Sequence, residues 1–153
     1  MTSPLHLAKR FFGALGRAPI GESQIELVQT TLLDSEFALW SAMMPIDKKH
    51  SIKVMSRFMQ IYPQATATQV RASLLHDVGK LESNLSVFAR VLATIVGERG
   101  SRFAKYHAHE KIGAQMLRQA GSDEETWQLV AGEVSDSPQL RTVLAALRQA
   151  DEI

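Results

Sequence analysis

The stretch Leu74-Leu75-His76-Asp77-Val78-Gly79-Lys80 joins an apolar run to two adjacent side chains that can bind metal. The apolar residues before this pair recur at the spacing of one helix face. Thr66 and Gln69 fit a capping box that opens a helix, and Gly79 is a residue type that often follows a helix end. We therefore predict a helix from Thr66 to about Val78, with His76 and Asp77 in its last turn.

Helical periodicity recurs along the rest of the sequence, and no segment alternates with the period of a strand. Capping residues, prolines and glycines mark the ends of these helices. We expect helices at residues 4–15, 23–33, 35–44, 45–62, 84–97, 103–119, 122–134 and from 138 onward. A chain of 153 residues has the size of one domain. The sequence therefore predicts an all-α, single-domain, multi-helix bundle.

Composition excludes several classes of protein. Hydrophobic residues make up 45% of the chain, which argues against disorder, and a net charge of +1 gives no reason to expect binding to long nucleic acids. The lack of cysteine excludes disulfides and thiolate metal sites. No apolar run is long enough to span a bilayer, and Lys9 and Arg10 interrupt any signal peptide. We expect a cytoplasmic protein.

The expected helix at residues 4–15 is amphipathic and carries basic residues. Its apolar face can pack on the core of its own domain. A helix of this composition can also bind a membrane surface or a partner protein. The shortness of the helix and its weak basic character favour packing on its own domain.

Several ionisable side chains fall on the apolar faces of separate expected helices. They are His50, His76, Asp77, His109 and Asp151. Burying a carboxylate is costly unless its charge is compensated, so one cation that binds the aspartates and neutral imidazoles would explain the pattern. The spacing also leaves open hydrogen-bonded core histidines and an Asp151 that reaches water near the end of the sequence.

At His76-Asp77-Val78-Gly79-Lys80 the sequence resembles the HD-domain superfamily of metal-dependent phosphohydrolases, whose pattern is His, then His-Asp, then Asp. On this resemblance His50 matches the first His, His76 and Asp77 match the doublet, and Asp151 matches the final Asp. The segment at residues 109–114, His-Glu-Lys-Ile-Gly-Ala, is similar to a His-x-x-Ile/Leu-Gly-Ala segment of many members. The resemblance implies His50, His76, Asp77 and Asp151 as metal ligands.

Four other segments resemble a group of small bacterial stand-alone HD-domain proteins. They are Arg10-Phe11-Phe12-Gly13-Ala14-Leu15, Glu36-Phe37-Ala38-Leu39-Trp40, Asp47-Lys48-Lys49-His50-Ser51 and Arg90-Val91-Leu92-Ala93-Thr94. The likeness thus covers almost the whole chain. We expect an N-terminal helix and loop at residues 1–22, packed on an HD domain at residues 23–153.

The resemblance implies a metal-dependent phosphohydrolase that cleaves a nucleotide or related phosphoester with a metal-activated water. Two His and two Asp ligands suit a transition-type divalent ion (Mn, Fe, Co, Ni or Zn) better than Mg or Ca. In this interpretation Asp77 is a ligand that also orients the nucleophile, Lys80 contacts phosphate, and His109 contacts phosphate or donates a proton. The structural alternative for Lys80 is a helix-end lysine that interacts with the helix dipole. The structural alternative for His109 is an ordinary buried histidine.

One departure from the family pattern limits this interpretation. Similar proteins often have Glu-His-His before the last helix, which supplies a histidine for a second metal, whereas this chain has Glu133-Val134-Ser135-Asp136. The resemblance therefore implies one metal and argues against a second. The missing histidine also keeps open a non-catalytic HD-type module that binds a metal or a nucleotide and works by interaction.

Overall fold

The structure is a computed structural model of the chain. It describes residues 19–81, 102–134 and 136–153, with the side chains of 102–108 left out. Every regular element in these ranges is helical, which confirms the predicted all-α class. The expected helices at residues 4–15 and 84–97 lie outside the described residues, and the proposed division at residue 22 stays a prediction.

The described helices follow the predicted order. They are α2 (Glu22–Thr31), α3 (Asp34–Ala42), α4 (Pro45–Ile61), α5 (Ala67–Leu75), the 3-10 helix η1 (Val78–Leu81), α7 (Arg102–Gln119), α8 (Glu124–Ala131) and α9 (Pro138–Glu152). Most ends agree with the predicted ends within two or three residues. Gly121 has φ of 82° and follows the end of α7, as expected for a helix-terminating glycine.

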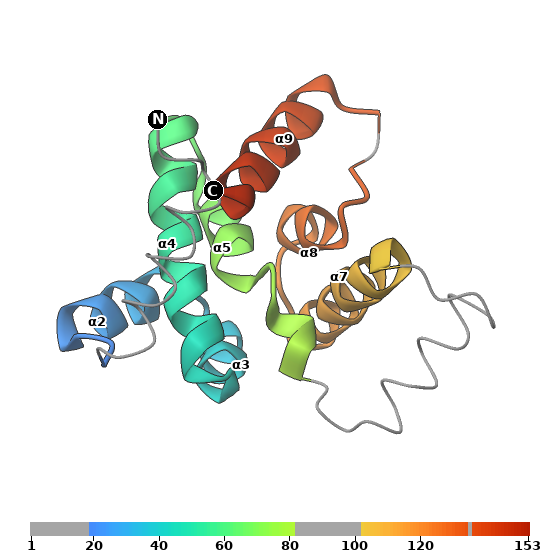
Figure 1. Cartoon of the computed structure of the whole chain (residues 1–153). Helices are drawn as coiled ribbons and strands as arrows, with labels where there is room; N and C mark the ends of the chain where they lie inside the picture. The colour runs from blue at the N-terminus through green and yellow to red at the C-terminus, as the bar shows by residue number, and fades with distance from the viewer. Residues whose placement is uncertain (1–18, 82–101, 135) are drawn as a thin grey trace.

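Helices α4 and α5 lie at the centre of the arrangement (Figure 1). Helix α9 packs along α4, while α8 packs between α5 and α7. Helices α2 and α3 lie at the other end of α4, where they also contact α5. None of the helices in the described ranges is both long enough and apolar enough to cross a bilayer.

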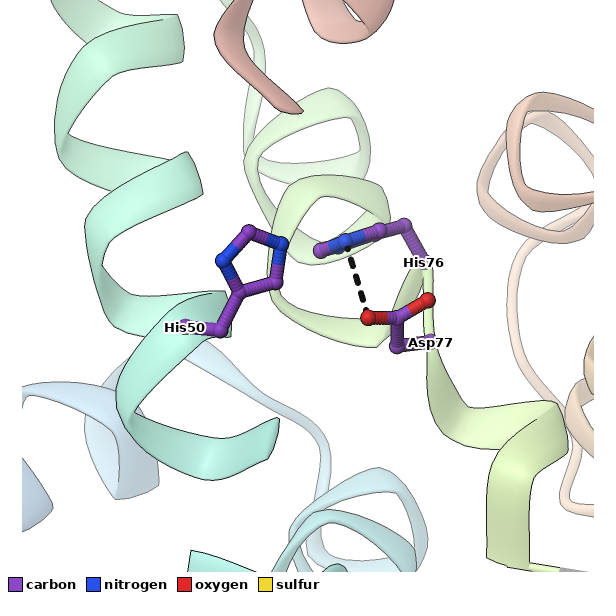
Figure 2. Close-up of side chains that lie close together, drawn as sticks. All are labelled: His50, His76 and Asp77. Atoms are coloured by element: carbon purple, nitrogen blue, oxygen red, sulfur yellow. Dashed lines mark ion pairs between the residues drawn. The ribbon is translucent and has the colours of Figure 1, made fainter. Parts of the chain in front are cut away.

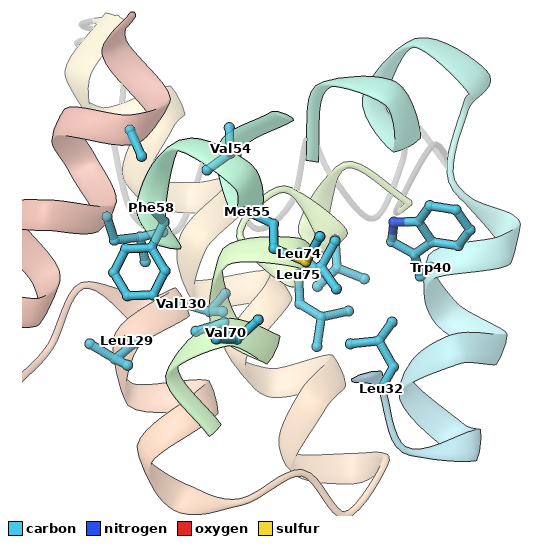
Figure 3. Packing of buried hydrophobic residues seen from close by; sticks show 14 of the residues in the cluster. Leu32, Trp40, Val54, Met55, Phe58, Val70, Leu74, Leu75, Leu129 and Val130 are labelled. Carbon is cyan, nitrogen blue, oxygen red and sulfur yellow. The ribbon is translucent and has the colours of Figure 1, made fainter. Parts of the chain in front are cut away.

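The hydrophobic core brings all of these elements together around α4 and α5 (Figure 3). Phe58 of α4 and Leu74 and Leu75 of α5 are completely buried. Full burial of side chains of this size contributes roughly 1.5–3 kcal/mol each. Because Leu74 and Leu75 directly precede His76, the core fixes the backbone from which the candidate site begins.

A buried hydrogen bond joins α3 to α4 beside His50. Trp40 is 2% exposed, and its Nε1 donates to Ser51 Oγ at 2.9 Å. Ser51 Oγ in turn donates to the carbonyl oxygen of Lys48 at 2.7 Å. A buried indole N–H needs such an acceptor, so this pair fixes the position of α3 against the turn of α4 that carries His50.

Helix α5 ends earlier than the sequence predicts. The predicted end near Val78 is wrong, because α5 stops at Leu75 and the chain turns through His76 and Asp77 into η1. His76 and Asp77 thus occupy a junction between two helices rather than the last turn of one. The turn lets two adjacent side chains reach the same space, which a continuous helix disfavours because neighbouring side chains diverge by roughly 100°.

Gly79 has a different role from the predicted helix end. A Cβ atom at Gly79 would lie 2.0 Å from the carbonyl oxygen of His109 and 2.8 Å from the amide nitrogen of Gly113. The backbone of η1 therefore approaches the backbone of α7 directly. Only glycine leaves room for this contact, which places His109 beside the His76–Asp77 junction.

Candidate metal centre

Three predicted ligands converge from two helical segments. His50 projects from α4, and His76 and Asp77 project toward it from the end of α5 (Figure 2). One ligand atom from each lies within 4.8 Å of the others. His50 and His76 are partly buried and Asp77 is buried, so the group is largely withdrawn from water. Helix α4 and the chain that follows α5 therefore assemble a mixed nitrogen and oxygen site.

Asp151 of α9 reaches the same place. Its Oδ1 lies 2.7 Å from His50 Nε2 and 3.2 Å from His76 Nε2. The structure thus brings all four residues of the predicted ligand set together. Asp151 does not turn away into the solvent, which was one of the alternatives that the sequence left open.

The ring of His76 is oriented by the backbone. Its Nδ1 lies 2.8 Å from the carbonyl oxygen of Ser73, which can only accept a hydrogen bond. In the neutral ring, Nδ1 is therefore the protonated nitrogen and Nε2 presents a lone pair. A hydrogen bond of this kind commonly fixes the tautomer of a histidine that ligates a metal.

The free lone pair of His76 faces two carboxylates. Nε2 is buried and lies 3.2 Å from Asp151 Oδ1 and 3.4 Å from Asp77 Oδ2, and neither contact has hydrogen-bond geometry. Acceptors that face each other repel unless a proton or a cation lies between them. The donor types and this arrangement fit a divalent ion of the kind that binds nitrogen and oxygen ligands together.

In the absence of such an ion, a proton takes its place. Burial lowers the pKa of His76, but the carboxylates of Asp151 and Asp77 outweigh this effect and raise the pKa to about 10. Burial raises the pKa of Asp77, but His76 and Lys80 more than reverse this and lower it. The metal-free site thus holds a protonated imidazole between two carboxylates, and an ion must displace that proton.

Lys80 lies directly against the cluster. Its Nζ donates to Asp77 Oδ2 at 2.9 Å and lies 3.6 Å from Asp47 Oδ1. Burial lowers the pKa of Lys80, but Asp77 and then Asp47 outweigh burial and raise it, so the ammonium stays charged. Because α5 ends five residues earlier, at Leu75, Lys80 interacts with side chains rather than with the end of that helix.

His109 of α7 lines a cavity of about 300 Å³ that also includes His76, Asp77, Lys80 and Asp151. Burial, and then the charge of Lys80, lower the pKa of His109. The imidazole is therefore neutral at neutral pH. Lys80 and His109, which were predicted to act beside Asp77, thus line the same cavity as three of the four predicted ligands.

The cavity contains two charged residues that the sequence analysis did not single out, Glu110 and Arg148. Its apolar wall is formed by Leu129, Val130, Leu144 and Leu147. Arg148 precedes Asp151 by three positions, so helical spacing alone places both on one side of α9. Nothing in the sequence shows that α8 comes close enough to enclose that side.

Two carboxylates of the stretch that replaces the expected second histidine, Glu133 and Asp136, lie away from the cavity. The side chain of Glu133 is 67% exposed and lies 3.9 Å from Lys111 Nζ. Asp136 is also exposed, and neither residue lines the cavity. As described, these two carboxylates are not placed to serve as ligands beside His109.

An arginine that sequence reasoning missed anchors the end of α9. Arg57, two turns after His50 on α4, directs Nη1 to the carbonyl oxygens of Ala150 and Ile153 at 3.3 and 2.9 Å. These carbonyls flank Asp151. Arg57 therefore holds the part of α9 that presents the Asp151 carboxylate to the cluster.

Comparison with known proteins gives one match. The model of the HD domain family matches residues 48–153, more than half of the chain. This region begins two residues before His50 and includes His76, Asp77 and Asp151. The chain matches no curated protein and no solved structure.

Proposed function

The chain belongs to the HD domain family, and we propose that it is a metal-dependent phosphohydrolase acting on a nucleotide or a related small phosphoester. Members of this family are typically metal-dependent phosphohydrolases. The observation that carries the proposal is the position of His76 Nε2, which lies 3.4 Å from Asp77 and 3.2 Å from Asp151 with His50 beside it.

We propose that His50, His76, Asp77 and Asp151 hold one transition-type divalent ion, such as Mn, Fe, Co, Ni or Zn. A bound ion would supply Lewis acidity, which lowers the pKa of water and polarises a phosphoryl oxygen. Asp77 would orient the attacking water, because the carboxylate sits at the cavity surface and is held by Lys80 at 2.9 Å.

The other cavity residues would bind and orient the phosphate. Lys80 keeps its positive charge and can stabilise the charge that grows on phosphate oxygens during attack. His109 is neutral, so its ring carries only one proton. We therefore favour a role in which this N–H donates a hydrogen bond to phosphate or to the leaving oxygen over one in which His109 transfers a second ring proton. The apolar wall would exclude water and strengthen both contacts.

The proposal is tested by phosphate release from a panel of nucleotides after chelation and reconstitution with each of the five metals. We expect activity that requires metal and falls by at least about 100-fold in His76→Ala and Asp77→Ala. Asp136→Asn is the matched control, because it removes an exposed carboxylate outside the cavity. Activity that survives His76→Ala and Asp77→Ala unchanged would refute the proposal.

A non-catalytic module that binds a metal or nucleotide is the second candidate. Similar proteins often have a histidine for a second metal in the stretch from Glu133 to Asp136. In this chain Glu133 and Asp136 lie outside the cavity, which favours the non-catalytic candidate. Stoichiometric metal binding without turnover across the panel would support this candidate. Robust turnover of any one substrate would eliminate it.

A further inference from the structure

Besides His76, the cavity is lined by two cationic side chains, Lys80 and Arg148, and they differ in their contacts with carboxylates of the protein. Lys80 is 2.9 Å from Asp77 and 3.6 Å from Asp47, so carboxylates of the protein already compensate its charge. Among the side chains that the structure describes, none forms an ion pair or hydrogen bond with the Arg148 guanidinium. Arg148 is therefore the cation that can accept an anionic ligand without first losing a partner.

Arg148 lies on the same helix as one of the predicted ligands, Asp151. It precedes Asp151 by three residues on α9, and side chains at this spacing are neighbours on one helix face, roughly 5–6 Å apart at Cβ. Both residues line the same cavity. A small molecule with one anionic group at the Asp151 end can therefore place another group at Arg148.

Gly132 makes room for the guanidinium at the end of α8. It has φ of 70°, and a Cβ atom there would lie 2.9 Å from Arg148 Nη2 and 3.1 Å from Glu110 Oε2. Any other residue would be strained and would press on both side chains. The Glu110 carboxylate thus lies near the guanidinium, and both side chains line the same cavity.

We propose that Arg148 binds a second anionic group of the substrate, so that favoured phosphoesters carry a carboxylate or another phosphate near the reacting phosphate. This inference rests on the function proposed above. The planar guanidinium can donate two parallel hydrogen bonds to either type of group, which a lysine cannot. The neighbouring apolar wall, Leu144 and Leu147 included, strengthens the interaction by limiting access of water.

The test uses two phosphonates that cannot be hydrolysed, 3-phosphonopropionate and propylphosphonate. They share a carbon chain and a phosphonate, but only the first carries a carboxylate. Binding to the Mn²⁺-loaded full chain is measured by calorimetry for the wild type and for Arg148→Gln. Arg141→Gln is the matched control, because it removes the same charge from α9 at an exposed position outside the cavity.

We expect the wild type and Arg141→Gln to bind 3-phosphonopropionate about tenfold more tightly than propylphosphonate. Arg148→Gln should abolish this preference and leave the affinity for propylphosphonate within about twofold. A preference that persists in Arg148→Gln, or that is missing in the wild type, would overturn the inference.

The same experiment separates this inference from the proposed function. Binding of propylphosphonate should require Mn²⁺ and His76 if phosphate binds at the metal centre, and it should not require Arg148. If the wild type binds propylphosphonate in an Mn²⁺-dependent way but shows no preference for 3-phosphonopropionate, only the role of Arg148 is overturned. Failure of both ligands to bind the wild type would overturn both proposals.

Discussion

His50 Nε2 and Asp151 Oδ1 lie 2.7 Å apart, although 101 positions separate the two residues in the sequence. This contact joins α4 to α9 at the ligand cluster. The candidate site therefore exists only when the two ends of the matched region have packed together. Binding of an ion should couple directly to the packing of α9.

Asp151→Asn should weaken Mn²⁺ binding by about tenfold or more, because it removes a charged oxygen that lies next to both His50 and His76. Calorimetric titration of the chelated protein measures the change. Asp136→Asn, an exposed substitution on the loop before α9, should leave the affinity unaltered. Equal affinity in Asp151→Asn and the wild type would remove Asp151 from the proposed ligand set.

Metal affinity should increase with pH. Below its pKa of about 10, His76 carries a proton in the metal-free protein, and the ion must displace that proton to reach Nε2. The apparent affinity for Mn²⁺ should therefore rise by about tenfold per pH unit between about pH 6 and pH 8. Titrations in two buffers of different ionisation enthalpy count the released proton. A flat affinity with no proton release would contradict the assigned protonation of His76.

Gly79→Ala should destabilise the fold by about 3 kcal/mol, because the added methyl group meets the His109 carbonyl oxygen at 2.0 Å and η1 must move away from α7. Urea unfolding followed by circular dichroism measures the loss. Gly21→Ala is the control, since the nearest atom to its Cβ would be 3.8 Å away. Similar stability of the two variants would contradict the close backbone contact.

Arg57→Gln should lower metal affinity without touching the cluster. Loss of the bonds to the Ala150 and Ile153 carbonyls frees the turn that carries Asp151, and we expect a decrease of about tenfold. The effect should disappear in the Asp151→Asn background, where there is no carboxylate left to position. Additive losses in the double variant would show that Arg57 acts by another route.

The helices could be predicted from local signals because each carries its own periodicity and end residues. Gly121 marks the end of α7 in the sequence as it does in the structure. The end of α5 could not be predicted in the same way. Gly79 looks like a helix-terminating glycine, but the contact that requires it comes from His109 and Gly113, more than 25 residues later.

The site, like the helices, has some residues that the sequence identifies and others that depend on long-range packing. The resemblance identified His50, His76, Asp77 and Asp151, and the structure places them together. Arg57, Glu110 and Arg148 were missed because a charged residue on a helix has no sequence signature that shows which face another helix will cover. Their positions depend on how α9 and α8 approach each other, which is a property of packing rather than of local pattern.

The backbone contact between Gly79 and Gly113 also has a consequence for how the protein can diversify. It fixes the separation of η1 and α7 by main-chain atoms, so the spacing of these two backbones does not depend on the side chains that line the cavity. Substitutions at positions 109 and 110 can therefore change the chemistry of recognition while the spacing of η1 and α7 is kept. A new ligand preference can therefore arise through single substitutions, and the protein stays folded after each of them.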